Sequence, residues 1–161
     1  MEQRNEARKR DLDQVSPPDA PVGSLMGLAG YHMRIAHALV FQDFRNRLGA
    51  TGITPAHLGI LLVVSENKHI SQTSLSKAMR MDRSSLVGVI DKLEAKGWLK
   101  RGKPTTDRRR NELYITSAGT KMLQEIWPNV QAHEEAITER LTVRERETFL
   151  RLLAKVAGTN V

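Results

Sequence analysis

The sequence predicts a mainly helical chain that carries one small β-hairpin, and three observations support this fold class. Helix-forming residues dominate the 161 positions, and aromatic residues make up only 4%. Apolar residues recur at helical spacing in six separate segments. A polar stretch rich in cations separates two short runs that are typical of strands. The expected order of elements is α-α-α-α-β-β-α-α.

The first part of the chain is predicted to hold a tail and two helices. Residues 1–22 are polar and contain three prolines, so we expect a flexible tail. Apolar spacing predicts a helix over residues 24–48, ended by glycines. Thr54 before Pro55 is a start signal for a second helix, because threonine caps and proline fits the first helical position. We expect this helix to pack inward through Leu58, Leu61, Leu62 and Ser65.

Two further helices follow, and only a tight turn separates them. Ser71 is the expected N-cap of a helix over residues 72–79, and Asp82 that of a helix reaching about residue 96. Gly97 supplies a left-handed stop. Two capped helices joined by so short a turn indicate a helix-turn-helix. Their buried sides are predicted at Leu75, Met79, Leu86, Val89, Ile90 and Leu93.

A hairpin and two more helices complete the predicted fold. Residues 98–101 and 112–115 are expected to be strands that form a wing with a basic tip. Thr116 caps a helix of about 20 residues, which Pro128 is expected to interrupt and kink. A capping box of Thr142 and Glu145 opens a last helix with a largely apolar face.

These elements predict a winged helix-turn-helix domain over residues 51–116. Residues 23–50 and 117–161 form the flanking helical region. In so short a chain, three flanking helices rich in Leu, Ile and Val are most easily buried by a second copy. We therefore expect this region to be a dimerisation platform and the protein to be a homodimer.

The positive charge is concentrated in one block. Residues 68–110 contain twelve basic and four acidic residues, a net charge of +8, whereas the rest of the chain carries −1. A concentrated patch of one sign is typical of a nucleic-acid-binding protein. The alternative is an ordinary solvated surface.

Composition and motifs argue against several other classes of protein. Without cysteine there is no disulfide, thiol redox sensor or cysteine zinc site, and the five scattered histidines predict no metal and no cofactor. No apolar run reaches the roughly 20 residues of a membrane span. The first residues lack a signal peptide's apolar stretch, so a cytoplasmic location is expected. No catalytic motif is present, so we expect no enzyme. The alternative of a DNA-cleaving enzyme would need acidic residues that bind a metal ion. Capping and the geometry of the wing already explain Asp82, Asp91 and Asp107.

Three consecutive motifs resemble those of the MarR family of bacterial regulators. They are residues 89–101 (VIDKLEAKGWLKR), 106–110 (TDRRR) and 113–119 (LYITSAG). The family pattern D-[RK]-L-E-x-x-G-[LWY]-[LIV]-x-R, D-x-R, L-x-[LIV]-T-x-x-G is matched at every anchor, and the resemblance covers residues 25–157. One departure is Val87 and Gly88, where the family often has a hydroxyl or an arginine. A glycine inside a helix costs about 1 kcal/mol, so we expect DNA or another backbone to approach closely there.

The resemblance implies a sequence-specific regulator of transcription that binds double-stranded DNA as a dimer. A symmetric dimer needs a near-palindromic operator with half-sites roughly 10 bp apart. The expected activity is repression. The alternatives are a nonspecific architectural DNA-binding protein and an activator of the same fold.

The second helix of a helix-turn-helix places its first residues at base edges in the major groove. Arg83 is expected to bind a guanine, and Ser84 and Ser85 to contact bases or phosphates. Lys77 and Lys92 are expected to contact phosphates, as are Ser71, Gln72 and Thr73 at the start of the preceding helix. The alternatives are a solvated arginine and ordinary first-turn serines.

The wing is expected to be a second DNA contact. Its tip carries Lys103, Arg108, Arg109 and Arg110, and arginine can enter a narrow minor groove. The resemblance favours Arg109 for that role, with Asp107 orienting the tip. The alternative is a purely structural ion pair between the two. Trp98 is expected to be a core residue under the wing.

The resemblance also implies a small-molecule effector, bound between the dimer platform and the DNA-binding lobe. An apolar wall with a tyrosine, a histidine and one arginine suits an aromatic acid or its CoA thioester. Core or dimer contacts are the alternative role for each of these residues. The predicted effector contacts are Tyr31, Arg34, Ala38, Phe41, His57 and Leu61.

Overall fold

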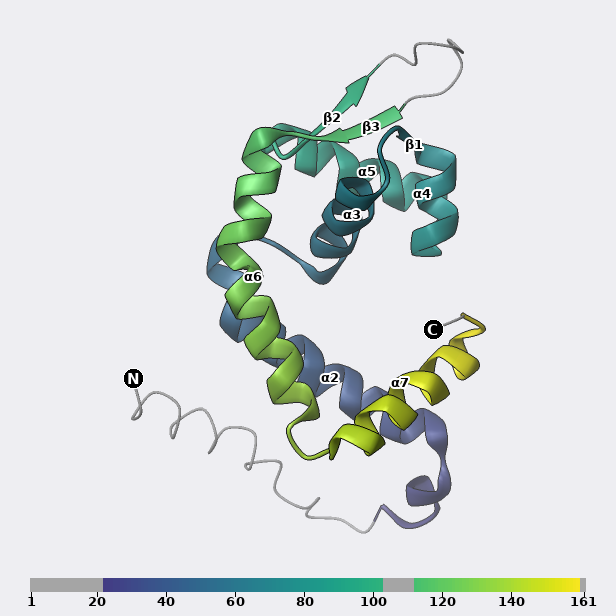
Figure 1. Cartoon of the computed structure of the whole chain (residues 1–161). Coiled ribbons are helices and arrows are strands. Elements are labelled where there is room, and N and C mark those ends of the chain that lie inside the picture. The colour runs from purple at the N-terminus through teal and green to yellow at the C-terminus, as the bar shows by residue number, and fades with distance from the viewer. Residues whose placement is uncertain (1–21, 103–111, 160–161) are drawn as a thin grey trace. The chain divides into compact units, whose positions relative to one another are not determined.

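A computed structural model describes residues 22–102 and 112–159 of the chain, and confirms a mainly helical fold with a small sheet (Figure 1). The chain divides into two compact units, residues 1–43 and 44–161. The elements are η1 (Gly23–Gly27), α2 (Ala29–Leu48), η2 (Gly49–Thr51), α3 (Pro55–Glu66), β1 (Ile70–Ser71), α4 (Gln72–Met79), α5 (Arg83–Ala95), β2 (Leu99–Gly102), β3 (Glu112–Ile115), α6 (Ser117–Thr138) and α7 (Val143–Ala157).

Each α-helix from α3 to α7 begins at its predicted cap. The hydroxyl oxygen of Thr54 accepts from the His57 amide at 3.2 Å, and that of Ser71 accepts from the Ser74 amide at 3.0 Å. A carboxylate oxygen of Asp82 accepts from the Ser85 amide at 2.9 Å. Caps of this kind satisfy amides that have no partner inside the helix. Thr116 and Thr142 cap α6 and α7 in the same way.

The hairpin belongs to a three-stranded antiparallel sheet with the order β1-β3-β2. Arg101 of β2 and Ile70 of β1 both pair with Leu113 of β3. The third strand, β1, was not predicted, because two residues are too few to show an alternating pattern. It ties the residues just before α4 to the wing.

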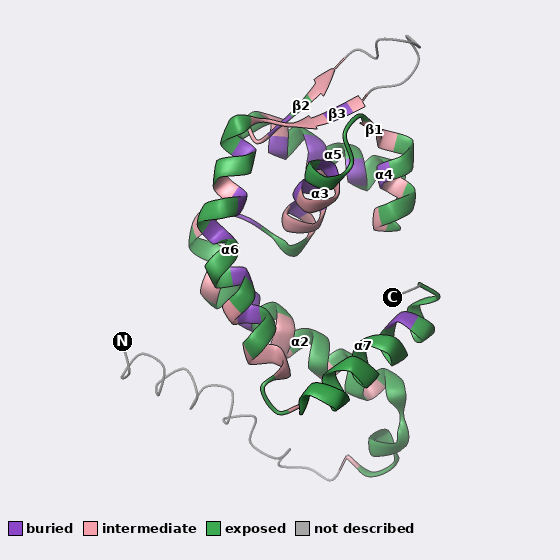
Figure 2. Cartoon of the chain, viewed as in Figure 1, coloured by how far each residue is buried: buried purple, intermediate pink, exposed green. Residues whose placement is uncertain are grey.

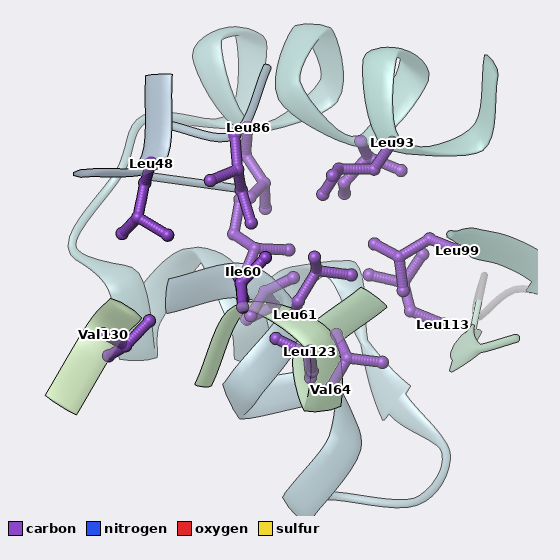
Figure 3. Close-up of a cluster of buried hydrophobic side chains, with 14 of the residues drawn as sticks. Leu48, Ile60, Leu61, Val64, Leu86, Leu93, Leu99, Leu113, Leu123 and Val130 are labelled. Carbon is purple, nitrogen blue, oxygen red and sulfur yellow. The ribbon is translucent and has the colours of Figure 1, made fainter. Parts of the chain in front are cut away.

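A single apolar core holds the winged part together (Figures 2 and 3). It is built from the end of α2, from α3, α4, α5 and α6, and from the sheet. Burial of one such side chain contributes about 1.5–3 kcal/mol relative to its exposure. The side chains with the lowest exposure are Leu48, Ile60, Leu61, Leu75, Leu86, Ile90, Leu93 and Leu113.

One glycine is required where α6 starts. A Cβ on Gly119 would collide with the carbonyl oxygen of Trp98 and the side chain of Ile115. The absence of a side chain therefore lets the first turn of α6 pack against the start of the wing. This contact explains the glycine in the T-x-x-G motif that begins at Thr116.

Two local predictions were wrong. On α3 the predicted Leu61 is fully buried, but Ser65 is exposed and Leu58 and Leu62 are only half-buried against the core, because the buried side also takes in His57, Ile60 and Val64. The helix α6 is also not interrupted at Pro128. Proline removes one backbone donor, which leaves the carbonyl four residues earlier, at Gln124, without its usual partner. Both positions are exposed, so water can satisfy that carbonyl.

The last helix, α7, is apolar on one side but mostly uncovered (Figure 2). Only Ala154 is buried, whereas Phe149, Leu150, Leu152 and Leu153 remain 40–48% exposed. At the end of α7, the guanidinium of Arg80 donates to the carbonyl oxygens of Ala157 and Gly158, the latter at 2.7 Å. Among the described residues, no single helix is long and apolar enough to cross a membrane, although one bent pair passes that test together.

Candidate nucleic-acid interface

The turn between α4 and α5 is fixed by hydrogen bonds on both sides. Arg80 adopts a left-handed conformation with φ of 49°, which ends α4. The Met81 amide donates to the Ser76 carbonyl at 3.1 Å, and the Ser76 hydroxyl donates to the Met81 carbonyl at 2.8 Å. Asp82 then caps α5 directly. This arrangement is the helix-turn-helix that the caps predicted.

Arg83 is exposed at the first position of α5, and one nitrogen of its guanidinium is hydrogen-bonded. Nη2 donates to Oγ1 of Thr73, in the first turn of α4, at 2.9 Å. The hydrogen bond joins the starts of the two helices. Because a guanidinium carries five N–H donors, four remain for another partner.

Ser84 is already engaged as a donor. Its hydroxyl lies 2.6 Å from Oδ1 of Asp82. Hydrogen bonds from the Ser84 and Ser85 side chains and the Ser85 amide hold the pKa of the Asp82 carboxyl far below its ordinary value. An ionised carboxylate only accepts, so the Ser84 proton lies in this contact and its lone pairs alone face solvent.

The other predicted contacts on α4 and α5 are partly or fully exposed. Thr73, Lys77, Ser85 and Lys92 are exposed, and Gln72 and Ser71 are half-buried. The hydroxyl of Ser71 is occupied at the N-cap, where it also lies 2.9 Å from the Ser74 hydroxyl. The hydrogen bond from Arg83 to Thr73 brings the starts of α4 and α5 together, and contact of the predicted residues with DNA stays a prediction. Lys103, Arg108, Arg109 and Arg110, with Asp107, lie outside the described residues.

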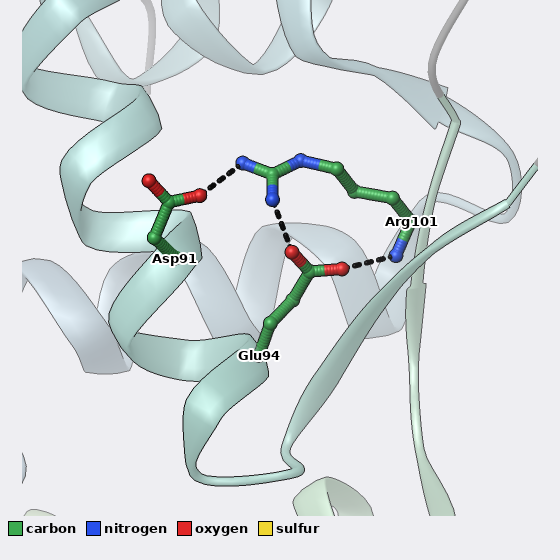
Figure 4. A network of polar contacts seen from close by, with 3 residues as sticks. All are labelled: Asp91, Glu94 and Arg101. Atoms are coloured by element: carbon green, nitrogen blue, oxygen red, sulfur yellow. Dashed lines mark hydrogen bonds and ion pairs between the residues drawn. The ribbon is translucent and has the colours of Figure 1, made fainter.

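An ion-pair network joins α5 to the wing (Figure 4). The Arg101 amide on β2 donates to Oε1 of Glu94 at 2.7 Å, and its guanidinium donates to the other carboxylate oxygen of Glu94. The same guanidinium reaches Oδ1 of Asp91 at 2.7 Å. Sequence reasoning assigned no such role to Arg101, although the acidic pair three residues apart on α5 is a usable signal. The network fixes the wing's base relative to α5.

A second polar cluster holds the other side of the wing. Nδ1 of His69 lies 2.9 Å from both Oε2 of Glu112 and the Tyr114 hydroxyl. The Tyr114 hydroxyl also donates to Glu112 at 2.5 Å. Donation from Tyr114 and then from His69 lowers the pKa of Glu112, and the same carboxylate raises the pKa of Tyr114. Because His69 precedes β1 and α4, this cluster links β3 to the helix-turn-helix.

Trp98 packs against the core at the other end of the sheet, as predicted. The Lys96 ammonium lies 4.5 Å from the centre of its indole ring and donates to the Gly52 carbonyl at 3.3 Å. His57 is buried nearby, and its Nδ1 accepts from the Thr54 amide at 3.3 Å. Burial, and then the positive charges of Lys96 and Lys92, lower the pKa of His57.

The predicted effector contacts fall into both units. Tyr31, Arg34, Ala38 and Phe41 lie on α2 in the first unit, where the Arg34 guanidinium is 5.7 Å from the centre of the Tyr31 ring. His57 and Leu61 lie in the second unit. The structure uses His57 in a capping box and buries Leu61 fully in the core. Effector binding by these residues stays a prediction. No group of three metal-ligating side chains occurs within residues 22–102 and 112–159.

The geometry defines a DNA-binding protein of the winged helix-turn-helix class, and the comparisons give the family. The sequence model of the MarR family matches residues 51–110. A putative transcriptional regulatory protein for the hcr operon of Thauera aromatica is 37% identical over 83% of this chain and 81% of its own length. The chain therefore belongs to the MarR family of transcriptional regulators.

Solved structures support the same fold. The repressor CouR bound to a 23-mer DNA duplex has a TM-score of 0.82 and 31% identity, over 86% of this chain and 99% of CouR. CouR bound to p-coumaroyl-CoA has a TM-score of 0.76 and 28% identity, over 86% of this chain and 98% of CouR. These relatives are named as regulators, not as enzymes.

Proposed function

We propose that this chain is a homodimeric repressor that binds a near-palindromic operator and is released by an aromatic acid or its CoA thioester. The exposed start of α5 is the observation that carries DNA recognition. There Arg83 is oriented by Thr73 and keeps free donors, within a segment of net charge +8. An oriented guanidinium suits the O6 and N7 acceptors of guanine in the major groove. Because the partner is DNA, the proposed location is the cytoplasm.

The test compares two DNA duplexes by fluorescence anisotropy. One is the fragment upstream of the protein's own gene, and the other is the same fragment with its sequence shuffled. We expect a preference of at least about 10³-fold for the native fragment and a steep loss of affinity with rising salt. A ratio near one would instead support a nonspecific architectural protein. Transcription from that promoter in vitro separates repression from activation.

Arg83→Ala sharpens that test. Losing a bidentate base contact costs about 1–3 kcal/mol, and the proposed dimer loses one in each half-site, so affinity for the operator should fall at least roughly 30-fold. Affinity for shuffled DNA should change much less. Lys121→Ala is the control, because it removes one exposed charge of an ion pair on α6. Equal losses in both variants would contradict base recognition by Arg83.

The homodimer is supported by the uncovered apolar side of α7. Four large apolar residues on one helix remain 40–48% exposed in the single chain. A second copy can bury them, and a two-fold dimer then presents two α5 helices to one duplex. Sedimentation equilibrium should give twice the mass of the 18.1 kDa chain. A monomer at micromolar concentration would overturn this part of the proposal.

The effector class is supported by α2 and by the CouR structures. Tyr31 and Phe41 offer aromatic surface, and the Arg34 guanidinium beside Tyr31 can pair with a carboxylate or phosphate. CouR is described both on DNA and with p-coumaroyl-CoA. Aromatic acids and their CoA thioesters are titrated into the protein–DNA complex, with free CoA and acetyl-CoA as controls. Release by an aromatic compound alone supports the class, and no release by any of them overturns it.

A further inference from the structure

Gly88 lies in the middle of α5, and the chain itself gives no reason for a glycine there. A Cβ on Gly88 would meet no heavy atom within 4 Å, and its φ is not positive. Glycine inside a helix costs about 1 kcal/mol relative to alanine. An approach from outside the chain therefore explains the missing side chain better than packing within it.

The residues around Gly88 form an exposed strip along α5. Val87 is 37% exposed, although valine is usually buried. Arg83 and Ser84 lie one turn earlier on the same side, because residues four apart are neighbours on a helix. The other side of α5, with Leu86 and Leu93, is fully buried in the core. Along the strip, Arg83 offers hydrogen-bond donors, Ser84 an acceptor and Val87 an apolar side chain. Gly88 then leaves a gap.

We propose that Val87 contacts the 5-methyl group of a thymine in the major groove and that Gly88 admits the DNA edge close to α5. This inference rests on the proposed DNA-binding function and names part of the sequence that is read. Among the four bases, only thymine offers an apolar group in the major groove. One helical turn advances about 5.4 Å and one base pair about 3.4 Å, so the thymine lies one or two base pairs from the pair that Arg83 contacts.

Gly88→Ala tests the close approach. In the free protein the added methyl group meets open space, so the melting temperature should stay equal or rise. Affinity for the native fragment should fall at least about tenfold, because the methyl group occupies the space that the DNA needs. Ser65→Ala, at an exposed position of α3, is the control that should leave affinity unchanged. Unchanged affinity in Gly88→Ala would overturn the inference about Gly88.

Replacing single thymines of the native fragment by deoxyuridine tests Val87, since this change removes only the methyl group. One position in each half-site should lose roughly fourfold in affinity, as expected for one buried methyl group. In Val87→Ala that loss should disappear. No sensitive thymine, or an equal loss in Val87→Ala, would overturn the assignment. Wild-type protein that prefers no sequence would instead overturn the proposed function itself.

Discussion

The winged part of the chain and its last helix have similar sequence patterns but very different surroundings. In the winged part, Leu86, Ile90 and Leu93 of α5 have no exposed surface. On α7, Leu152 and Leu153 are 48% and 40% exposed, although they belong to an equally regular apolar face. The winged part therefore completes its own core, whereas α7 does not.

This difference separates two kinds of information in an amphipathic pattern. Apolar residues at helical spacing predict which side of a helix avoids water. They do not say whether the same chain or another one covers that side. For α5 the cover is α3, α4 and the sheet, and for α7 we propose a second copy.

The largest expected effect comes from the self-contained core. Leu93→Ala removes a side chain with no exposed surface, so the free energy of unfolding should fall by about 2–5 kcal/mol. Urea denaturation followed by circular dichroism measures the change. A loss below about 1 kcal/mol would mean that the winged part does not close its core as described.

The second effect concerns assembly instead of the core. Leu152→Glu places a charge on the exposed apolar side of α7, so the dimer dissociation constant should rise at least about tenfold while helix content is kept. Arg151→Glu, also exposed on α7, is the control. Sedimentation velocity across a dilution series gives both constants. An undiminished dimer in Leu152→Glu would remove α7 from the interface.

A smaller effect is expected where α5 meets the wing. In Arg101→Lys the side chain cannot hydrogen-bond to Asp91 and Glu94 at the same time, because lysine lacks the planar guanidinium of arginine. Partly exposed ion pairs contribute at most about 1 kcal/mol to stability, so the melting temperature should change little. Operator affinity should fall about fivefold, since the wing loses its fixed position. Stability and affinity that fall together would instead indicate a purely structural role.

The smallest expected effect is a pH dependence at His57. Burial and two lysines lower its pKa, so the folded chain favours the neutral ring. In the unfolded chain the pKa is about 6.5, and the stabilisation is lost as the pH falls below that value. His57→Gln keeps an acceptor for the Thr54 amide. In this variant the free energy of unfolding should depend less on pH between about pH 7 and about pH 5. Urea denaturation at several pH values measures this free energy. An equal change with pH in the wild type and in His57→Gln would contradict the role of His57.

The sequence predicted the helices of the second unit well because their ends are set locally. A cap such as Ser71, Asp82 or Thr116 bonds an amide three residues away, so the signal lies within one turn. The short strand β1 escaped prediction because its pairing with β3 joins residues over 40 positions apart. The error on α3 arose because two apolar faces one residue apart compete in a helix with few polar residues.

The same distinction applies to the candidate interface. Exposure of Arg83 and Ser84 follows from the helix start and was predicted. Their orientation was not, because it depends on Thr73 and Asp82, and a side-chain hydrogen bond has no periodicity. The link from Arg101 to Glu94 crosses from strand to helix and needed the folded chain.

The hydrogen bonds from Arg80 to the carbonyls of Ala157 and Gly158 have a practical consequence for handling the protein. They tie the turn before α5 to the last turn of α7. A change that unwinds the last turn of α7 would therefore disturb that turn as well. Variants of α7 that are made for binding measurements should keep this last turn intact.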